Sequence, residues 1–117
     1  KKTSDIAKKI ALSLVSSNEF ELMTLVAQLS DSKKEFSSML KIFSSILRDV
    51  MILLAKASVA DANDCAKTLS EKLSMKQVLN LIDIIHCTKD YVEKNVNLSN
   101  VTTFFCSNLF KISNRNL

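Results

Sequence analysis

The stretch KKEFSSMLKIFSSILRDVMILLAKA, residues 33–57, decides the fold of this chain. From Phe36 to Leu54 its apolar residues recur at steps of 4, 3, 4, 3 and 4, the spacing of one face of an α-helix. A second apolar stripe runs beside the first and consists of Met39, Ile42, Ile46 and Leu53. A helix with two apolar stripes is covered by neighbours on several sides. The stretch therefore predicts a long central helix around which the rest of the chain packs.

The chain has 117 residues and contains neither glycine nor proline, although these two make up about 12% of average proteins. Two-residue hairpin turns need the positive φ that glycine supplies most easily, so folds with many β-turns are disfavoured. The same absence excludes the Gly-rich loops that bind phosphates. The composition therefore predicts an all-α fold.

The starts of the helices are marked by capping boxes, in which a Ser or Asn side chain accepts a backbone hydrogen bond and a Glu or Gln three residues later reaches back. Three such pairs begin new apolar periods: Asn18 with Glu21, Ser32 with Glu35, and Ser74 with Gln77. With the apolar periodicity they predict six helices, at about residues 5–15, 19–29, 33–57, 62–73, 75–94 and 98–112. Because the connections are short, we expect consecutive helices to pack antiparallel in a compact bundle.

Two helix boundaries are predicted from residues outside the capping boxes. Asn95 and Asn97 are candidates for a turn and a cap before the last helix, because asparagine tolerates left-handed φ and accepts backbone hydrogen bonds. The long helix has Ala57 where glycine commonly follows a helix, so it must end without a left-handed glycine. We expect Ser58 and Asp61 to cap the next segment and so to set the stop of the long helix.

The length fits a single helical domain spanning residues 1–117. A content of 47% hydrophobic and 24% charged residues is ordinary for a folded globular chain. The longest apolar run, residues 50–55, is far shorter than the roughly 18 residues of a membrane span, so no membrane helix is expected. The chain opens on lysine rather than methionine, and we expect it to be a domain excised from a longer protein.

The net charge of +4 raises the question of nucleic-acid binding. Residues 1–16 contribute +3 and Lys111 with Arg115 contributes +2, so the remainder sums to −1. A surface that tracks nucleic acid concentrates cations along one element and often adds aromatic residues for stacking. Here the excess lies at the ends, and the phenylalanines have the spacing of core residues. A helical nucleic-acid-binding domain is therefore an alternative hypothesis rather than the leading one.

Three side chains, Asp83, His86 and Asp90, share one face of the fifth predicted helix. This spacing could hold a metal ion, or let a carboxylate orient the imidazole in a small metal-dependent enzyme. The chain has a single histidine, however, and no second helix supplies the Glu-x-x-His partner of di-metal bundles. The preferred interpretation is an exposed histidine flanked by charges, with no catalytic, metal-binding or cofactor-binding residue in this domain.

The positions of the cysteines in the sequence do not indicate a chemical role. Cys65, Cys87 and Cys106 are odd in number, widely spaced and lack a C-x-x-C pair, which argues against a disulfide framework and against a zinc site. Cys87 follows His86 directly, but adjacent helical residues point about 100° apart, so a Cys/His nucleophile is disfavoured. The sequence predicts reduced, buried thiols in an intracellular protein.

Arg48 and Asp49 are the remaining candidate pair. Arg48 falls on the polar side of the long helix, whereas Asp49 interrupts its second apolar stripe between Ile46 and Leu53. A carboxylate in such a position is costly unless it is paired. The pair therefore predicts either a structural salt bridge to a neighbouring helix or a place in a subunit interface.

Three segments carry a family resemblance when taken in order. They are the stretch at residues 43–56 that contains Leu47-Arg48-Asp49, the Leu73-Ser74-x-x-Gln77-x-Leu79 helix start, and Asn95-Val-Asn97 before a final apolar helix. Over about residues 33–112 the chain resembles the C-terminal domain of the delta-prime subunit of the bacterial DNA polymerase III clamp loader. The related helical domain of the gamma/tau subunits is the second choice.

The resemblance implies a collar module, a helical domain that joins clamp-loader subunits into a ring. Its partners would be the gamma/tau and delta subunits, DNA would be met only through the full complex, and the location would be cytoplasmic. The family's ATP-site residues lie in other domains, so none maps onto this chain. We expect a non-enzymatic oligomerisation domain that supports loading of the sliding clamp in DNA replication.

Overall fold

The computed structural model describes residues 2–16, 19–29, 32–55, 64–94 and 97–113. These ranges contain six α-helices and no strand, which confirms the predicted all-α class. The helices are α1 (Lys2–Ser16), α2 (Glu19–Ala27), α3 (Lys33–Leu54), α4 (Asp64–Lys72), α5 (Met75–Glu93) and α6 (Leu98–Ser113). Within the described ranges, no helix is both long and apolar enough to span a bilayer.

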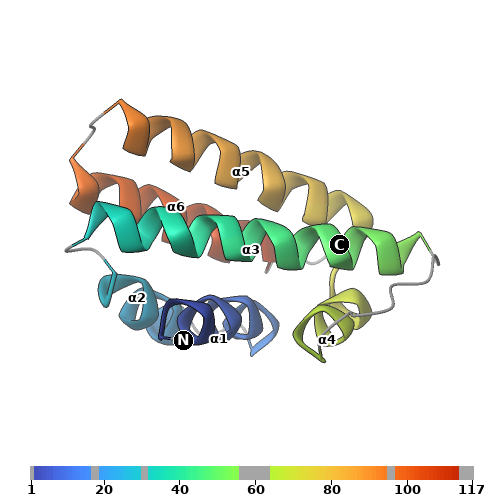
Figure 1. Cartoon of the computed structure of the whole chain (residues 1–117). Helices are drawn as coiled ribbons and strands as arrows, with labels where there is room; N and C mark the ends of the chain where they lie inside the picture. Colours follow the sequence, from blue (N-terminus) through green and yellow to red (C-terminus); the bar gives the residue numbers. More distant parts are fainter. Residues whose placement is uncertain (1, 17–18, 30–31, 56–63, 95–96, 114–117) are drawn as a thin grey trace.

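Helix α3 lies at the centre of the bundle, as its two apolar stripes predicted (Figure 1). It packs against α1, α4 and α5. Most of both stripes is buried, through Phe36, Met39, Leu40, Phe43, Ile46, Leu47 and Val50, whereas Ile42, Leu53 and Leu54 are half-buried against the core. Helix α6 also contributes to the core. Its Phe105 ring packs edge to face against the rings of Phe36 and Phe43, at centroid distances of 5.6 and 6.2 Å.

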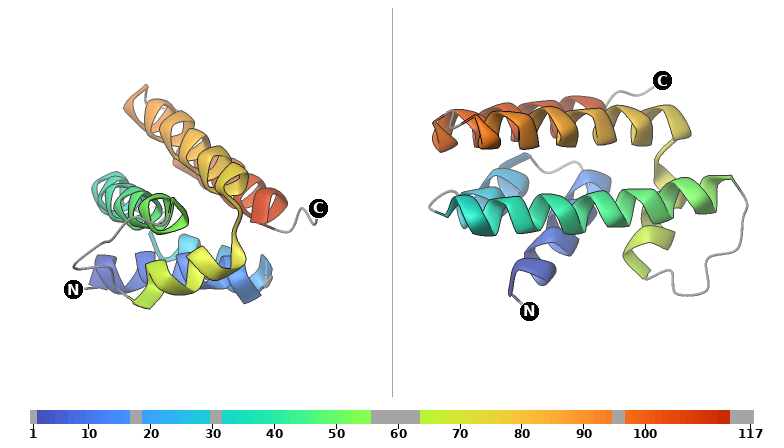
Figure 2. Two further views of the ribbon diagram at one scale, coloured as in Figure 1. Left: turned by 90° about the vertical axis from the view of Figure 1, so that its right-hand side faces the viewer. Right: turned by 45° about the horizontal axis from the view of Figure 1, so that its top comes forward.

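The helices form two layers rather than a simple antiparallel series. Helices α5 and α6 are antiparallel neighbours, and with α3 they make the upper layer of Figure 1. Helices α1 and α4 run beneath α3 and across its axis, as the left view of Figure 2 shows. The expected antiparallel packing of consecutive helices therefore holds for α5 and α6 but fails elsewhere: α4 crosses α3, and neither α2 with α3 nor α4 with α5 forms a closely packed pair. With 9 residues against the 22 of α3, α4 is too short to cover α3 lengthwise, and a crosswise position lets α1 and α4 share its underside.

Of the two predicted capping boxes that the structure describes, one forms completely and the other in part. Ser74 and Gln77 form a complete capping box. Ser32 Oγ accepts from the Glu35 amide at 3.2 Å, but the Ser32 amide donates to the carbonyl oxygen of Leu29, so only half of that box forms. Asn18 lies outside the described residues.

The long helix ends earlier than predicted. Its last residue is Leu54, and Ala55 closes it with φ −79° and ψ 4°. This conformation is not left-handed, which confirms that the helix ends without the usual glycine geometry. Ala57, Ser58 and Asp61, on which the predicted stop depended, lie outside the described residues.

Candidate interaction surface

Most of helix α6 falls within the longest stretch of the sequence without charge. Residues 95–110 contain no Asp, Glu, Lys or Arg, although 24% of the chain is charged. Several of these residues are solvent-exposed in the structure: Asn97, Ser99, Asn100, Thr103 and Ser107. Exposed helix positions usually carry charge, and the centres of protein interfaces are depleted of it. The exposed side of α6 is thus unusual for a purely solvated surface.

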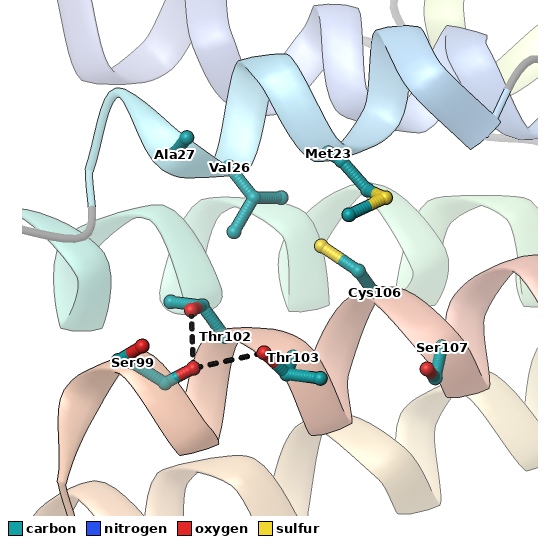
Figure 3. Close-up of a pocket in the computed structure, with 8 residues that line it drawn as sticks. All are labelled: Met23, Val26, Ala27, Ser99, Thr102, Thr103, Cys106 and Ser107. Carbon is teal, nitrogen blue, oxygen red and sulfur yellow. Dashed lines mark hydrogen bonds between the residues drawn. The ribbon is translucent and has the colours of Figure 1, made fainter.

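Local hydrogen bonds explain how this polar, uncharged sequence forms a helix. Asn97 Oδ1 accepts from the amides of Ser99 and Asn100, at 2.9 and 3.4 Å, and so caps α6 as predicted. The hydroxyls of Thr102 and Thr103 donate to the carbonyl oxygen of Ser99, at 2.9 and 3.0 Å (Figure 3). Because these hydroxyl donors already have acceptors within the helix, apolar groups of a partner can cover them without leaving a donor unpaired. Asn95, the other predicted turn residue, lies outside the described residues.

A groove of about 280 Å³ separates α6 from α2 (Figure 3). Its α2 wall is apolar, and its α6 wall consists mostly of hydroxyl-bearing side chains. The residues that line it are Met23, Val26, Ala27, Ser99, Thr102, Thr103, Cys106 and Ser107. None of the lining residues is charged, and the groove is slightly smaller than the usual 300–1,000 Å³ of small-molecule sites. It fits one or two protein side chains better than a substrate.

Phe20 does not line the groove but lies on the same side of α2 as two residues that do. It is 80% exposed, and Met23 is 52% exposed. Phe20, Met23 and Ala27 are spaced i, i+3 and i+7, so they form one stripe of α2. The groove and this aromatic side chain therefore belong to one surface, which we call the α2–α6 face.

The exposure of Phe20 corrects the prediction that the phenylalanines are core residues. Phe36, Phe43 and Phe105 are fully buried, as the spacing predicted. Phe20 differs because the buried side of α2 carries Leu22, Leu25 and Val26, which turns position 20 outward. Phe104 is half-buried, and its ring packs edge to face on Tyr91 at a centroid distance of 5.1 Å.

The predicted pair on α3 lies away from this face. Arg48 is exposed and Asp49 is half-buried. Neither side chain forms an ion pair or a side-chain hydrogen bond with another described residue. The salt bridge to a neighbouring helix is therefore not seen among the described residues, and the role of the pair in an interface remains a prediction.

The cluster on α5 does not assemble into a site. Asp83, His86 and Asp90 are all exposed, and Asp90 pairs instead with Lys94 at 3.1 Å on the helix surface. Across the described ranges, no group of three His, Cys, Asp or Glu side chains has the arrangement of a metal site. The interpretation of His86 as an exposed histidine is confirmed.

The thiols are buried in two cases out of three. Cys65 and Cys106 are buried, Cys87 is exposed, and none of them is in a disulfide. The prediction of burial was wrong for Cys87, because α5 buries the opposite stripe, with Val78, Leu81, Ile85, Thr88 and Val92. Burial raises the pKa of the Cys65 thiol above its ordinary value, and the charge of Lys8 opposes that rise only in part.

No protein-family model matches the chain, and the comparisons with curated proteins and with solved structures found no match either.

The α2–α6 face was not identified from the sequence. Its only sequence signal is the uncharged run at residues 95–110. The α2 wall of the groove has no comparable signal, because residues 23–27 meet residues 99–107 only after the chain has folded.

Proposed function

We propose that this chain is a helical assembly domain, and specifically the collar domain of a clamp-loader subunit of the delta-prime type. Two features support the proposal: the ordered segments of the sequence that resemble that family, and an all-α bundle built around one long helix. In this role the domain joins gamma/tau and delta subunits into a ring and performs no chemistry itself.

The observation that carries the assembly role is the uncharged α2–α6 face. A charge that is buried against a partner loses its hydration, so a surface that must be buried is best built without charges. Aromatic side chains that enter a partner's pocket commonly contribute most of the binding energy. Phe20 is the exposed aromatic of this face, and complete burial of a Phe side chain contributes about 1.5–3 kcal/mol.

The core beneath the α2–α6 face contains no gap that a partner would have to fill. The core beneath α2 and α6 is complete, since Leu22, Val26, Val101 and Phe105 are each at most 1% exposed. Phe20 and Met23 lie outside that core, so a partner would add contacts to a finished bundle. An interface of this kind suits the joining of separately folded domains.

The test is co-purification of this chain with the C-terminal domain of gamma/tau from the same organism, at micromolar concentration. We expect a complex for the wild type and none for Phe20→Ser or for Thr103→Lys, which puts a charge on the face. The matched control is Leu79→Ser, because Leu79 is also an exposed apolar residue, 48% exposed, but lies on α5. Absence of a wild-type complex would overturn the clamp-loader assignment. Equal weakening by Leu79→Ser would overturn the role of the α2–α6 face.

A further inference from the structure

Helix α3 has a solvent-exposed stripe opposite its buried side. The stripe consists of five residues at steps of 4, 3, 4 and 3, each of them exposed: Lys34, Ser38, Lys41, Ser45 and Arg48. At 1.5 Å of rise per residue, it is about 21 Å long. The buried residues of α3 centre on the opposite side of the helix, toward the core shared with α6, which lies behind α3 in Figure 1.

The stripe carries charge of one sign. Lys34, Lys41 and Arg48 recur every seven residues, which sets them about 10.5 Å apart along the helix. Of the two carboxylates of α3, Glu35 lies about 100° around the helix from Lys34, whereas the half-buried Asp49 is one turn beyond Ser45 and borders the stripe. None of the three cations forms an ion pair with a described residue. Two serine hydroxyls alternate with these cations.

We infer that this α3 stripe binds the phosphate backbone of a nucleic acid. Phosphate oxygens are contacted chiefly by Arg and Lys, and by hydroxyl side chains such as Ser, which are the residue types of the stripe. No aromatic residue lies on it, so there is no platform on which bases could stack. The contact is therefore to the backbone and independent of base sequence. A rigid helix holds the three cations in a straight row without further ordering of the chain.

Charge complementarity and the position of the apolar residues of α3 indicate which polyanion binds the stripe. A helix that binds an anionic membrane needs an apolar face to insert, and the apolar stripes of α3 are buried in the core. An acidic protein is a second polyanion, and the experiment separates it from nucleic acid. The net charge of the sequence lies mainly at the ends of the chain, whereas this site depends on cations within one helix. It is separate from the α2–α6 face and does not depend on the proposed assembly role.

The test is fluorescence anisotropy with a labelled 20-nucleotide single strand and a labelled 20-base-pair duplex. Neutralisation of three phosphates predicts that log K falls with log salt at a slope of about −2 for the single strand and about −3 for the duplex. The variant Lys34→Gln/Lys41→Gln/Arg48→Gln is expected to lose about tenfold or more in affinity at low salt, together with most of that slope. The matched control is Lys67→Gln/Lys76→Gln/Lys111→Gln, which removes the same charge from exposed positions on α4, α5 and α6.

Three results would overturn the inference. The first is an equal loss of affinity in the control variant, which would assign binding to net charge. The second is unchanged DNA binding by the stripe variant. The third is tighter binding of the wild type to polyglutamate or to phosphatidylserine vesicles than to DNA. Circular dichroism checks that the variants fold. If the triple variant unfolds, Ser45→Glu replaces it, because a carboxylate between Lys41 and Arg48 is expected to weaken DNA binding in the same way.

Discussion

The Gln77 side chain ties the start of α5 to the end of α6. Its Nε2 donates to the carbonyl oxygen of Ile112 at 3.0 Å, while its Oε1 accepts from the amide of Ser74 at 2.9 Å. One amide group therefore caps its own helix and satisfies a carbonyl in the last turn of another, where carbonyl oxygens lack helical partners. Only glutamine among the capping-box residues can do both, because glutamate has no donor.

Replacement of Gln77 should separate these two contributions. Gln77→Ala removes both bonds and is expected to lower the free energy of unfolding by about 1–2 kcal/mol. Gln77→Glu keeps the acceptor for Ser74 but sets a carboxylate against the carbonyl oxygen of Ile112, so part of this loss should remain. Urea denaturation measures both. Wild-type stability in Gln77→Glu would show that the bond to Ile112 contributes nothing.

The Phe105 ring should be the most sensitive aromatic position. It is fully buried between Phe36 and Phe43, and Phe105→Ala is expected to lower the free energy of unfolding by about 3–5 kcal/mol, a large part of the stability of a small domain. The control is its neighbour Phe104, which is half-buried against Tyr91, and Phe104→Ala should cost clearly less. Urea denaturation curves for the two variants decide the order, and equal losses would contradict the packing described.

The three thiols should react at different rates. Cys87 is exposed on α5, whereas Cys65 and Cys106 are buried. In native protein, a thiol reagent such as DTNB is expected to modify one cysteine quickly and the other two only as the fold opens. Cys87→Ser should abolish the fast phase and leave the slow phase intact. A fast phase that survives this substitution would mean that one of the buried sites is accessible.

Ionisation of the Cys65 thiol should make the protein less stable as the pH rises. Burial raises the pKa of this thiol in the folded state, so above the ordinary value of 9.0 the unfolded chain releases a proton that the folded chain still holds. The unfolded state then binds fewer protons, and the free energy of unfolding decreases as pH rises. Denaturation between about pH 8 and 10 should show this decrease in the wild type and a smaller one in Cys65→Ala. Cys87→Ala is the control and should keep the wild-type pH dependence.

The starts of the helices could be predicted more accurately than their ends. Helices α2, α3, α5 and α6 begin where the sequence placed them, because caps such as Ser32, Ser74 and Asn97 act on amides only two or three residues away. The end of α3 lies three residues before the predicted one. The chain lacks glycine, the residue that most commonly marks a helix end, so the ends have a weaker signal than the starts.

Burial within each helix also followed from local spacing, with instructive exceptions. Thr88 is fully buried on α5, although its hydroxyl is polar, because it donates to the carbonyl oxygen of Ile84 at 2.7 Å and needs no other partner. Phe20 is exposed although it is among the most apolar residues of α2. In both cases the position on the helix decided burial, and residue type did not.

The sequence by itself determined that the chain is helical, where most helices begin, and that α3 is covered on more than one side. These properties depend on residues within one or two turns of each other, and helical periodicity records them directly. Only the tertiary structure decided that α1 and α4 cross beneath α3, that Gln77 reaches Ile112, and that α2 and α6 border a groove. These relationships depend on how side chains of distant segments interlock when helices pack, and no local pattern encodes the angle between two helices.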